Sequence, residues 1–444
     1  MAGTSLRLHD GARVAVVGAG PAGTLFAHHL LASAREAGLR LAGTLCDGSA
    51  LADGWACRMG AGVLAQSLVD GLLAAGIALP ECLIQRRITG YLLEIPFGTL
   101  HLFPPGDASG ALTVFRGQGP RGAKEDGVAS LDRHLLDVVL REGVLLLPYY
   151  VRGIVPPQAA DDPVRLRLGG AGDRWIEADL VVGACGLNSR FPEQVAELGL
   201  GYQPPRRIGS IQVELDLGSE TVDRLFGNAI AVYLLNFPGV LFAAVTPKRR
   251  YATVTLVGNS LGDEHLARFF DHPRVRRRLE AAGKTGAVVC RCRPWAVESA
   301  AVQPYGDRLV MIGDAAASRL YKNGLQSALV TAKAAASTAV LHGISKGDFA
   351  RHYGTVCAEI AHDNVNGRFV FHVYEYIIER FPWVARRLLE VAAAEQLHNP
   401  PNRRPTCELL WQTLSGDRPY SEIRARLLRP GLFLHLLREG NAAR

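Results

Sequence analysis

A glycine-rich hexapeptide near the N-terminus constrains this 444-residue chain more than any other feature. The segment Gly18-Ala-Gly-Pro-Ala-Gly23 directly follows the apolar run 13–17 and precedes residues 24–37, which have the spacing of a helix. In such a unit Gly18 permits a tight turn, Gly20 lets a pyrophosphate approach the backbone, and Gly23 lets helix and strand pack closely. The pattern predicts a strand–helix–strand unit that binds a dinucleotide.

An acidic residue supports this prediction. Asp47 lies 24 residues after Gly23, at the end of the apolar run 39–46, where a carboxylate can accept hydrogen bonds from both hydroxyls of a ribose. The helix that begins beside Pro21 offers free backbone N–H groups to a phosphate. We therefore expect Gly18, Gly20, Pro21, Ala22, Gly23 and Asp47 to contact the cofactor. The alternative is a glycine turn with a purely structural role.

A second acidic strand end indicates which dinucleotide is bound. The buried run 308–312 ends in Gly313-Asp314, and Gly324 opens a long Ala-rich helix over 324–341. An acid at a strand end can bind the hydroxyls of a ribityl chain, and a helix N-terminus can stabilise negative charge on a reduced flavin. These features favour FAD over NAD, which has neither group.

Three segments in a fixed order carry a family resemblance. Between the two segments above lies 179–190, which reads DLVVGACGLNSR and includes Gly186. Together the three resemble the FAD-dependent family that includes the geranylgeranyl reductases and aromatic hydroxylases of the p-hydroxybenzoate hydroxylase type. The resemblance covers roughly residues 10–345. It implies a parallel-sheet FAD domain interrupted by an antiparallel substrate domain, with the flavin between them and with Gly186, Gly313, Asp314 and Gly324 at the cofactor.

Two further segments bear on the branch of this family. Residues 233–248 resemble the aromatic-Phe-Pro strand with which geranylgeranyl reductases line an apolar tunnel, so the resemblance places Tyr233, Phe237 and Pro238 at the substrate. Residues 55–64 contain Cys57 where those reductases carry a cysteine followed by glycines. The same segment is also similar to an arginine-containing stretch of p-hydroxybenzoate hydroxylase, which implies that Arg58 contacts the cofactor.

The chain departs from the family pattern at several positions. Cys185 stands where most members have an aspartate, and the arginine that usually precedes the helix at 131–142 is missing. Lys322 and Asn323 replace a proline and an acid before Gly324. Lys322 is a candidate catalytic residue because an ammonium there can stabilise anionic reduced flavin; the alternative is a solvated lysine.

Cys57 is the other candidate catalytic residue. If a hydride reaches one end of a C=C bond, the other end needs a proton, which a thiol can supply. The alternative is a small, buried packing residue. Cys290 and Cys292 share one face of an expected strand, but without two further ligands they make a poor zinc motif. We expect no metal site.

The charge of the chain is unevenly distributed. The formal net charge is +7, yet residues 380–444 alone hold 11 Arg against 6 acids. Without interleaved aromatic residues, this pattern argues against nucleic-acid binding. The basic amphipathic stretches 369–389 and 423–437 can lie on an anionic membrane or cover the substrate domain, and we favour the second. With eight dispersed cysteines and no long apolar run, we expect a cytoplasmic protein, with peripheral association at the inner membrane surface as the alternative.

The sequence thus predicts an α/β fold, α+β overall: a Rossmann-like FAD-binding domain, an inserted antiparallel substrate domain and a helical C-terminal region. The predicted FAD domain comprises 1–75, 128–205 and 296–345, the substrate domain 76–127 and 206–295, and the helical region 346–444.

The predicted function is reduction of a C=C bond in an apolar isoprenoid or lipid-like molecule. The alternatives are a flavin monooxygenase acting on an apolar or aromatic small molecule, and a flavin-containing lipid-binding protein without turnover. The sequence has no second glycine fingerprint for a nicotinamide cofactor, so it leaves open whether NAD(P)H or a protein is the electron donor, and it does not indicate an oligomeric state.

Overall fold

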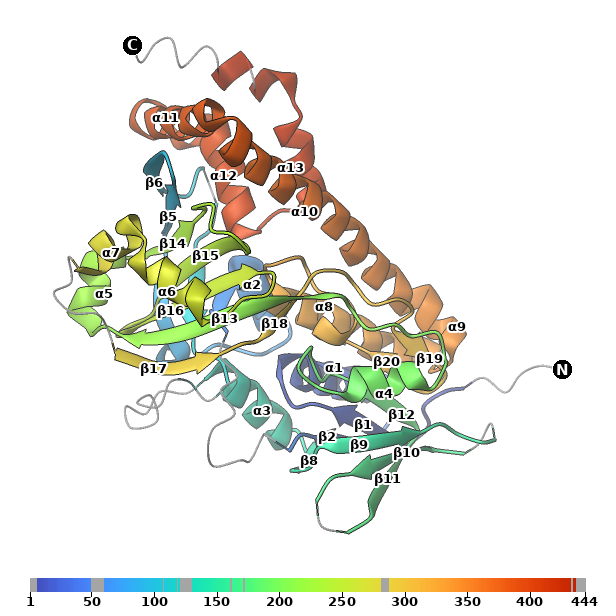
Figure 1. The fold of residues 1–444 in the computed structure, drawn as a ribbon. Helices are drawn as coiled ribbons and strands as arrows, with labels where there is room; N and C mark the ends of the chain where they lie inside the picture. Colours follow the sequence, from blue (N-terminus) through green and yellow to red (C-terminus); the bar gives the residue numbers. More distant parts are fainter. Residues whose placement is uncertain are drawn as a thin grey trace.

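The computed structural model describes residues 6–48, 60–106, 108–117, 119, 130–159, 162–170, 172–280, 287–432 and 434–436. Within these residues two large sheets stand one above the other, and a group of C-terminal helices covers the end of the upper sheet (Figure 1). The mixture of a parallel sheet, antiparallel sheets and a helical region confirms the predicted fold class.

The lower sheet is six-stranded, in the order β19-β20-β12-β1-β2-β8, and is parallel except for β19. Its strands are short and almost wholly apolar because both faces are covered. Helices α1, α3 and α8 pack together on it, and the three-stranded meander β9–β11 shares the same core. The elements are β1 (Arg13–Val17), α1 (Pro21–Glu36), β2 (Ala42–Cys46), α3 (Leu131–Arg141), β8 (Leu145–Leu147), β9 (Val151–Val155), β10 (Val164–Leu168), β11 (Arg174–Ala178), β12 (Leu180–Gly183), α4 (Phe191–Glu197), β19 (Tyr305–Gly306), β20 (Leu309–Met311), the 3-10 turn η3 (Gly313–Ala315) and α8 (Gly324–Ser337).

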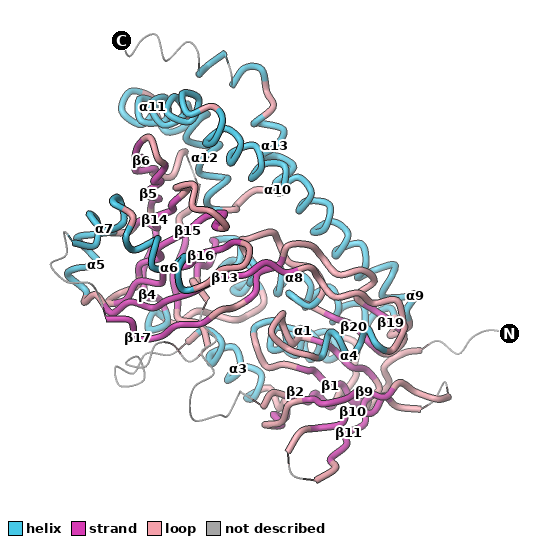
Figure 2. The backbone as a smooth tube through the Cα atoms, in the orientation of Figure 1, coloured by secondary structure: helices cyan, strands magenta, loops and turns pink. Residues whose placement is uncertain are grey.

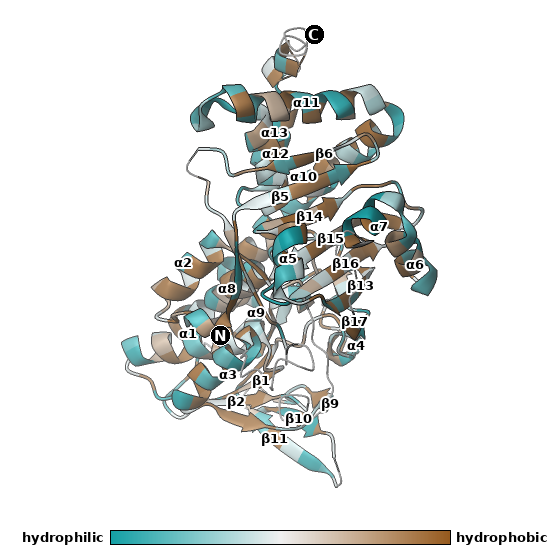
Figure 3. Cartoon of the chain, turned by 90° about the vertical axis from the view of Figure 1, so that its left-hand side faces the viewer, coloured by the Kyte–Doolittle hydropathy of each residue, from teal (hydrophilic) through white to brown (hydrophobic). Residues whose placement is uncertain are grey.

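The upper sheet is eight-stranded, with β18 paired to β13 beside the path β17-β13-β16-β15-β14-β5-β6. One face buries the apolar side chains of α5, α6 and α7, and the outer sides of α5 and α7 carry many hydrophilic residues (Figure 3). The other face lines a cavity. The elements are β5 (Gly90–Ile95), β6 (Gly98–Leu102), β13 (Arg207–Asp216), α5 (Ser219–Phe226), β14 (Ala229–Tyr233), β15 (Val240–Pro247), β16 (Tyr251–Gly258), α6 (Asp263–Asp271), α7 (Pro273–Glu280), β17 (Ala287–Cys292) and β18 (Trp295–Val297).

A small three-stranded sheet, β3-β7-β4, has α2 and the 3-10 turn η1 beside it. Its Leu64 and Leu112 pack in the core of the lower sheet, and its Thr113 donates to the Pro247 carbonyl oxygen in the upper sheet. Residues 63–65 and 111–114 form two short strands of this small sheet. The elements are β3 (Val63–Ala65), α2 (Gln66–Ala74), η1 (Glu81–Leu83), β4 (Ile84–Ile88) and β7 (Ala111–Val114).

The C-terminal region is helical, as the sequence predicts (Figure 2). The long helix α10 runs from beside the parallel sheet to the far end of the upper sheet, and α11 packs on β6 there (Figure 1). The region therefore covers both sheets instead of forming a detached unit. Its elements are η4 (Thr338–His342), α9 (Lys346–Asp348), η5 (Phe349–Tyr353), α10 (Gly354–Arg380), α11 (Pro382–His398), η6 (Pro401–Arg403), α12 (Pro405–Ser415) and α13 (Tyr420–Leu427).

Candidate functional site

One cavity of about 2070 Å³ extends from the glycine-rich loop, past the exposed face of the upper sheet, to the underside of α10–α12. At the parallel sheet its wall is rich in glycine and polar side chains, and beneath the C-terminal helices it is mostly apolar. Of the residues that the sequence places at a cofactor or substrate, the cavity is lined by Gly18, Gly20, Pro21, Ala22, Asp47, Gly186, Phe237, Pro238, Asp314, Lys322 and Gly324.

The glycine-rich loop has the backbone that its sequence requires. Gly18 has φ 112°, and a Cβ there would stand 2.5 Å from the Ala184 carbonyl oxygen. A Cβ on Gly23 would overlap the Gly18 carbonyl oxygen, although Gly23 itself does not line the cavity. Gly20 differs, because nothing lies within 4 Å of its Cβ position. The loop therefore leaves an open approach to the backbone at the N-terminus of α1.

Asp47 lies at the end of β2, next to this loop. Its carboxylate Oδ2 accepts a hydrogen bond from the backbone N–H of Ala19 at 2.9 Å, and the side chain is buried. The structure thus brings Asp47 and the glycine-rich loop to one place, as the sequence predicts.

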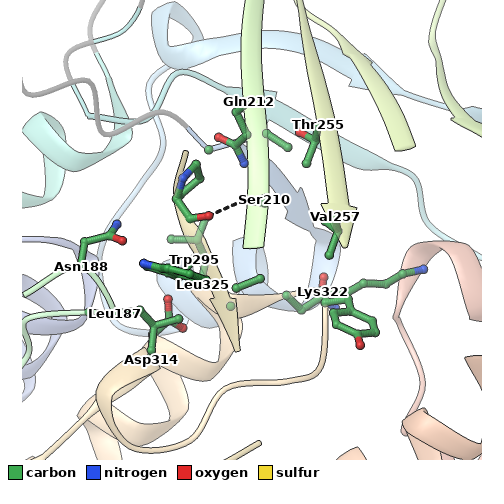
Figure 4. Close-up of a pocket in the computed structure, with 18 of the residues that line it drawn as sticks. Leu187, Asn188, Ser210, Gln212, Thr255, Val257, Trp295, Asp314, Lys322 and Leu325 are labelled. Carbon is green, nitrogen blue, oxygen red and sulfur yellow. Dashed lines mark hydrogen bonds between the residues drawn. The ribbon is translucent and has the colours of Figure 1, made fainter. Parts of the chain in front are cut away.

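The Gly313-Asp314 turn lies against the start of α1. A Cβ on Gly313, whose φ is 61°, would stand 2.8 Å from the Ala22 side chain. There is therefore no room for a methyl group between this turn and the first helix. Asp314 lines the cavity, and its burial raises the pKa of its carboxyl group. In Figure 4 its carboxylate lies beside Leu187, which follows Gly186. Three separate chain segments therefore meet around one end of the cavity.

An arginine that the sequence pattern does not indicate also lies in this wall. Arg116 lines the cavity, and its guanidinium Nε donates to Asp132 Oδ2 at 2.7 Å. Burial opposes the charged guanidinium, but the Asp132 carboxylate raises the pKa of Arg116 above its ordinary value. The family pattern has an arginine just before the helix at 131–142. Here Arg116 contacts Asp132 in the first turn of that helix from a position 16 residues earlier in the chain, where sequence spacing gives no signal.

The aliphatic part of the Lys322 side chain lines the cavity, but its amine does not. Nζ donates to the carbonyl oxygens of Thr413 and of Leu414, the latter at 2.8 Å, at the C-terminal end of α12. In Figure 4 the amine points away from the other labelled side chains. Burial lowers the pKa of Lys322 to about 7. The prediction that this ammonium faces the flavin is therefore corrected: the amine is an anchor for α12.

The loop before α8 carries further anchors and an unusual backbone. Asn323 Nδ2 donates to the Gly416 carbonyl oxygen at 2.9 Å, and Arg319 donates to the same oxygen. Tyr321 and Asn323 have φ values of 59° and 52° in the left-handed region that non-glycine residues rarely adopt. Such strained residues persist where the surrounding contacts hold them, often at ligand sites.

One predicted substrate residue has the wrong orientation. Tyr233 is 2% exposed and packs edge-on against Phe269 beneath α6, with 5.3 Å between the rings. Its neighbours Val232 and Leu234 line the cavity instead, because successive side chains of a strand point to opposite faces. Tyr233 is therefore a core residue of the opposite face of the sheet.

Cys57 and Arg58 lie outside the described residues, so their predicted roles stay predictions. The segment that follows them lines the cavity at 60–63. Cys185, a departure from the family pattern, also lines the cavity, and burial raises the pKa of its thiol to about 12. Among the described residues no group of three His, Cys, Asp or Glu side chains is placed to hold a metal ion.

The chain matches no protein-family model and no curated protein sequence. It does resemble solved structures. A geranylgeranyl bacteriochlorophyll reductase-like protein from Thermoplasma acidophilum has a TM-score of 0.66 at 14% identity, covering 95% of this chain and 99% of that one. A variant of halogenase PltM in complex with FAD has a TM-score of 0.60 at 14% identity, covering 98% and 97%. The p-nitrophenol 4-monooxygenase from Pseudomonas putida has a TM-score of 0.55 at 14% identity, covering 97% of this chain and 99% of that one. The chain therefore shares its fold with a reductase-like protein, with a halogenase that was solved with FAD, and with a monooxygenase.

Proposed function

We propose that this chain is an FAD-dependent oxidoreductase that reduces a C=C bond of an apolar isoprenoid or lipid-like molecule. The observation that carries the proposal is the continuity of one cavity from the glycine-rich loop and Asp47 to an apolar region beneath α10–α12. A cavity of about 2070 Å³ exceeds the roughly 300–1,000 Å³ of ordinary ligand pockets, which leaves room for a dinucleotide and a second molecule together.

The described residues fit FAD. The open backbone at Gly20 and the N-terminus of α1 suit a pyrophosphate, and the Asp47 carboxylate suits a ribose. Asp314 and the N-terminus of α8 at Gly324 suit the ribityl and flavin end. Bound FAD would supply a centre that gives or accepts a hydride, which no side chain of the protein can do.

The chain's own residues would hold and shield the substrate. The side chains of Ile230, Val232 and Leu234 and the apolar residues of α10–α12 would surround an alkene and reduce its contact with water. Arg116, whose guanidinium is paired with Asp132 and held by it, would offer its remaining N–H groups to the dinucleotide. Cys57 is proposed to deliver the proton from its Sγ to the second carbon of the reduced bond.

The test is anaerobic turnover of the purified protein. Flavin absorbance measures bound FAD, and mass spectrometry after reduction and addition of an isoprenoid alkene measures a gain of two hydrogen atoms. The proposal expects stoichiometric FAD and a saturated product. FAD-loaded protein that forms product only with O₂ and adds oxygen to it would contradict the reductase.

A monooxygenase is the second candidate, favoured by the similarity to p-nitrophenol 4-monooxygenase. It predicts that labelled oxygen from ¹⁸O₂ enters the product. A flavin-containing lipid-binding protein without turnover is the third. It predicts FAD that neither NAD(P)H nor a reduced ferredoxin can reduce, with lipid bound but unchanged.

We also propose that the corner between α10 and α11 rests on an anionic membrane surface. None of the described helices has the length and hydropathy needed to cross a bilayer. At this corner Tyr376, Phe381 and Trp383 are 50%, 40% and 60% exposed, and Arg380 and Arg386 flank them. Ile377, Ile378 and Ala385 of the same corner line the cavity, so an apolar substrate would pass from lipid to the cavity without crossing water.

A further inference from the structure

One row of side chains crosses the upper sheet at the cavity. Strand pairing places Gln212 opposite Thr255, Thr255 opposite Ala244, Ala244 opposite Val232 and Val232 opposite Leu93. All five line the cavity. With strands about 4.8 Å apart, the row spans roughly 19 Å from β13 to β5. Its composition changes along the way, from an amide and a hydroxyl at one end to aliphatic groups at the other.

Two polar atoms at one end of this row lack hydrogen-bond partners among the described residues. Gln212 and Thr255 are 9% and 8% exposed, and among the described residues neither Gln212 Oε1 nor Thr255 Oγ1 has a hydrogen-bond partner. Buried polar atoms without partners cost free energy and are rare in folded proteins. In Figure 4 both side chains project from their neighbouring strands on the side where Trp295 and Asp314 lie. Two unpartnered atoms on directly paired residues therefore mark a ligand site.

The neighbouring groups do not satisfy these atoms. Ser210, two residues before Gln212 on the same face, donates its hydroxyl to the Pro294 carbonyl oxygen at 2.7 Å. Glu214, two residues after it, pairs with Lys248 at 3.2 Å, and Thr253 bonds to both. The charges beside the row are thus neutralised by each other, and the open positions belong to uncharged groups.

We infer that Gln212 and Thr255 bind a hydroxyl group at one end of an otherwise apolar ligand. A single hydroxyl can donate to Gln212 Oε1 and accept from the Thr255 hydroxyl, which satisfies both atoms. A carbonyl oxygen can only accept and would leave Gln212 Oε1 unpaired, and a carboxylate would meet no compensating charge. The terminal torsion of glutamine is soft, so the amide can turn toward a ligand in the cavity.

The inference specifies the substrate of the proposed function and rests on that function. The ligand is an amphipathic alcohol whose hydroxyl lies at β13 and β16, and whose apolar body extends along Ala244, Val232 and Leu93 toward α10–α12. This orientation also directs the alkene, because binding one end of the molecule fixes which bond lies near the parallel sheet.

The experiment compares three probes of the same carbon skeleton by calorimetry on the FAD-loaded protein: farnesol, farnesene and farnesoic acid. One neutral hydrogen-bonded pair predicts that farnesol binds about tenfold more tightly than farnesene, and farnesoic acid no better than farnesene. Gln212→Leu and Thr255→Val should each bring the farnesol affinity close to that of farnesene. Gln66→Leu, at a residue of α2 that does not line the cavity, should change neither affinity.

The same variants provide a second measurement. Because each removes a buried polar atom that has no partner, Gln212→Leu and Thr255→Val should raise the midpoint temperature of unfolding of the ligand-free protein while they weaken farnesol binding. A merely structural role predicts loss of both. If one variant does not fold, the other still gives both readings.

The outcomes separate the two proposals. The hydroxyl site would be overturned by equal affinities for farnesol and farnesene, by binding of none of the probes, or by unchanged farnesol affinity in the variants. Each of these results would count against the hydroxyl site whether or not bound FAD reduces an alkene. Preference for farnesol in a protein that binds no FAD would support the hydroxyl site and refute the proposed oxidoreductase.

Discussion

Asp47 Oδ2 accepts a hydrogen bond from the backbone N–H of Ala19 at 2.9 Å, so the end of β2 and the loop between β1 and α1 are joined before any cofactor arrives. The contact is buried. A carboxylate bonded to a backbone N–H is held in one place, which reduces the ordering that binding would require.

Replacing Asp47 should weaken cofactor binding. Asp47→Asn removes the charge but keeps the size, and the loss of charge-assisted hydrogen bonds predicts FAD affinity about 10- to 100-fold lower, measured by fluorescence titration. Asp70→Asn, on the exposed side of α2, is the matched control and should leave the affinity unchanged. Equal affinity in Asp47→Asn and wild type would contradict the role of this carboxylate.

Two alanine substitutions in the glycine-rich loop should have different effects. In Gly23→Ala the new methyl group overlaps the Gly18 carbonyl oxygen, so we expect unfolding free energy to fall by about 2 kcal/mol or more. In Gly20→Ala nothing lies within 4 Å and φ is −76°, so stability should change by a few tenths of a kcal/mol at most while FAD binding weakens. Chemical denaturation measures the first quantity and titration the second. Similar stability of both variants would refute the packing argument.

Lys322 should make stability depend on pH. Its pKa is lowered from 10.5 to about 7, so between these values the folded protein binds fewer protons at this site than the unfolded chain does, and stability rises with pH. In Lys322→Met this part of the rise should disappear, whereas Lys346→Met, at an exposed lysine, should keep it. Thermal unfolding between pH 6.5 and 10.5 measures the slopes, and identical slopes for wild type and Lys322→Met would count against the buried amine.

The proposed membrane contact can be tested at Trp383. Loss of one aromatic anchor in Trp383→Ser predicts binding to anionic vesicles about tenfold weaker, measured by co-sedimentation. Trp175, which is 42% exposed on β11, is the matched position, and Trp175→Ser should bind vesicles as wild type does. An equal effect of both substitutions, or of neither, would argue against this corner as the docking surface.

Cys57 is tested by kinetics. If its thiol gives the proton to the product, Cys57→Ala should lower the turnover number about 10²- to 10⁴-fold with FAD content unchanged. Cys82→Ala, at an exposed cysteine of η1, is the control. Wild-type turnover in Cys57→Ala would make the cysteine a packing residue.

The fold was predictable where one short segment carries its own signal. The glycine-rich loop and the strand before Gly313 each combine a periodicity with residues that only one local backbone accommodates. His272 separates α6 from α7, a break that helical spacing alone does not reveal. Residues 111–114 were missed because a four-residue strand between two loops has too short a pattern to recognise.

The candidate site was predictable only in part, for three physical reasons. Tyr233 lies in a strand that is apolar on both faces, so its sequence does not reveal which face meets the cavity. Arg116 contacts Asp132 only in the folded chain, and the spacing of the two residues in the sequence does not indicate this contact. The amine of Lys322 is turned away by carbonyl oxygens of α12, a helix more than 80 residues further along the chain.

The anchoring of α12 to the loop before α8 has a consequence for how the two ends of the cavity communicate. Lys322 holds the last carbonyl groups of α12, whose Leu410 and Leu414 line the cavity. Arg319 and Asn323 hold the carbonyl group of Gly416, the residue that follows this helix. A dinucleotide at Gly324 and an apolar molecule under α12 would therefore bind on opposite sides of these contacts between the loop before α8 and the end of α12. If binding of the first ligand changes the affinity of the protein for the second by some factor, thermodynamic linkage requires that binding of the second changes the affinity for the first by the same factor.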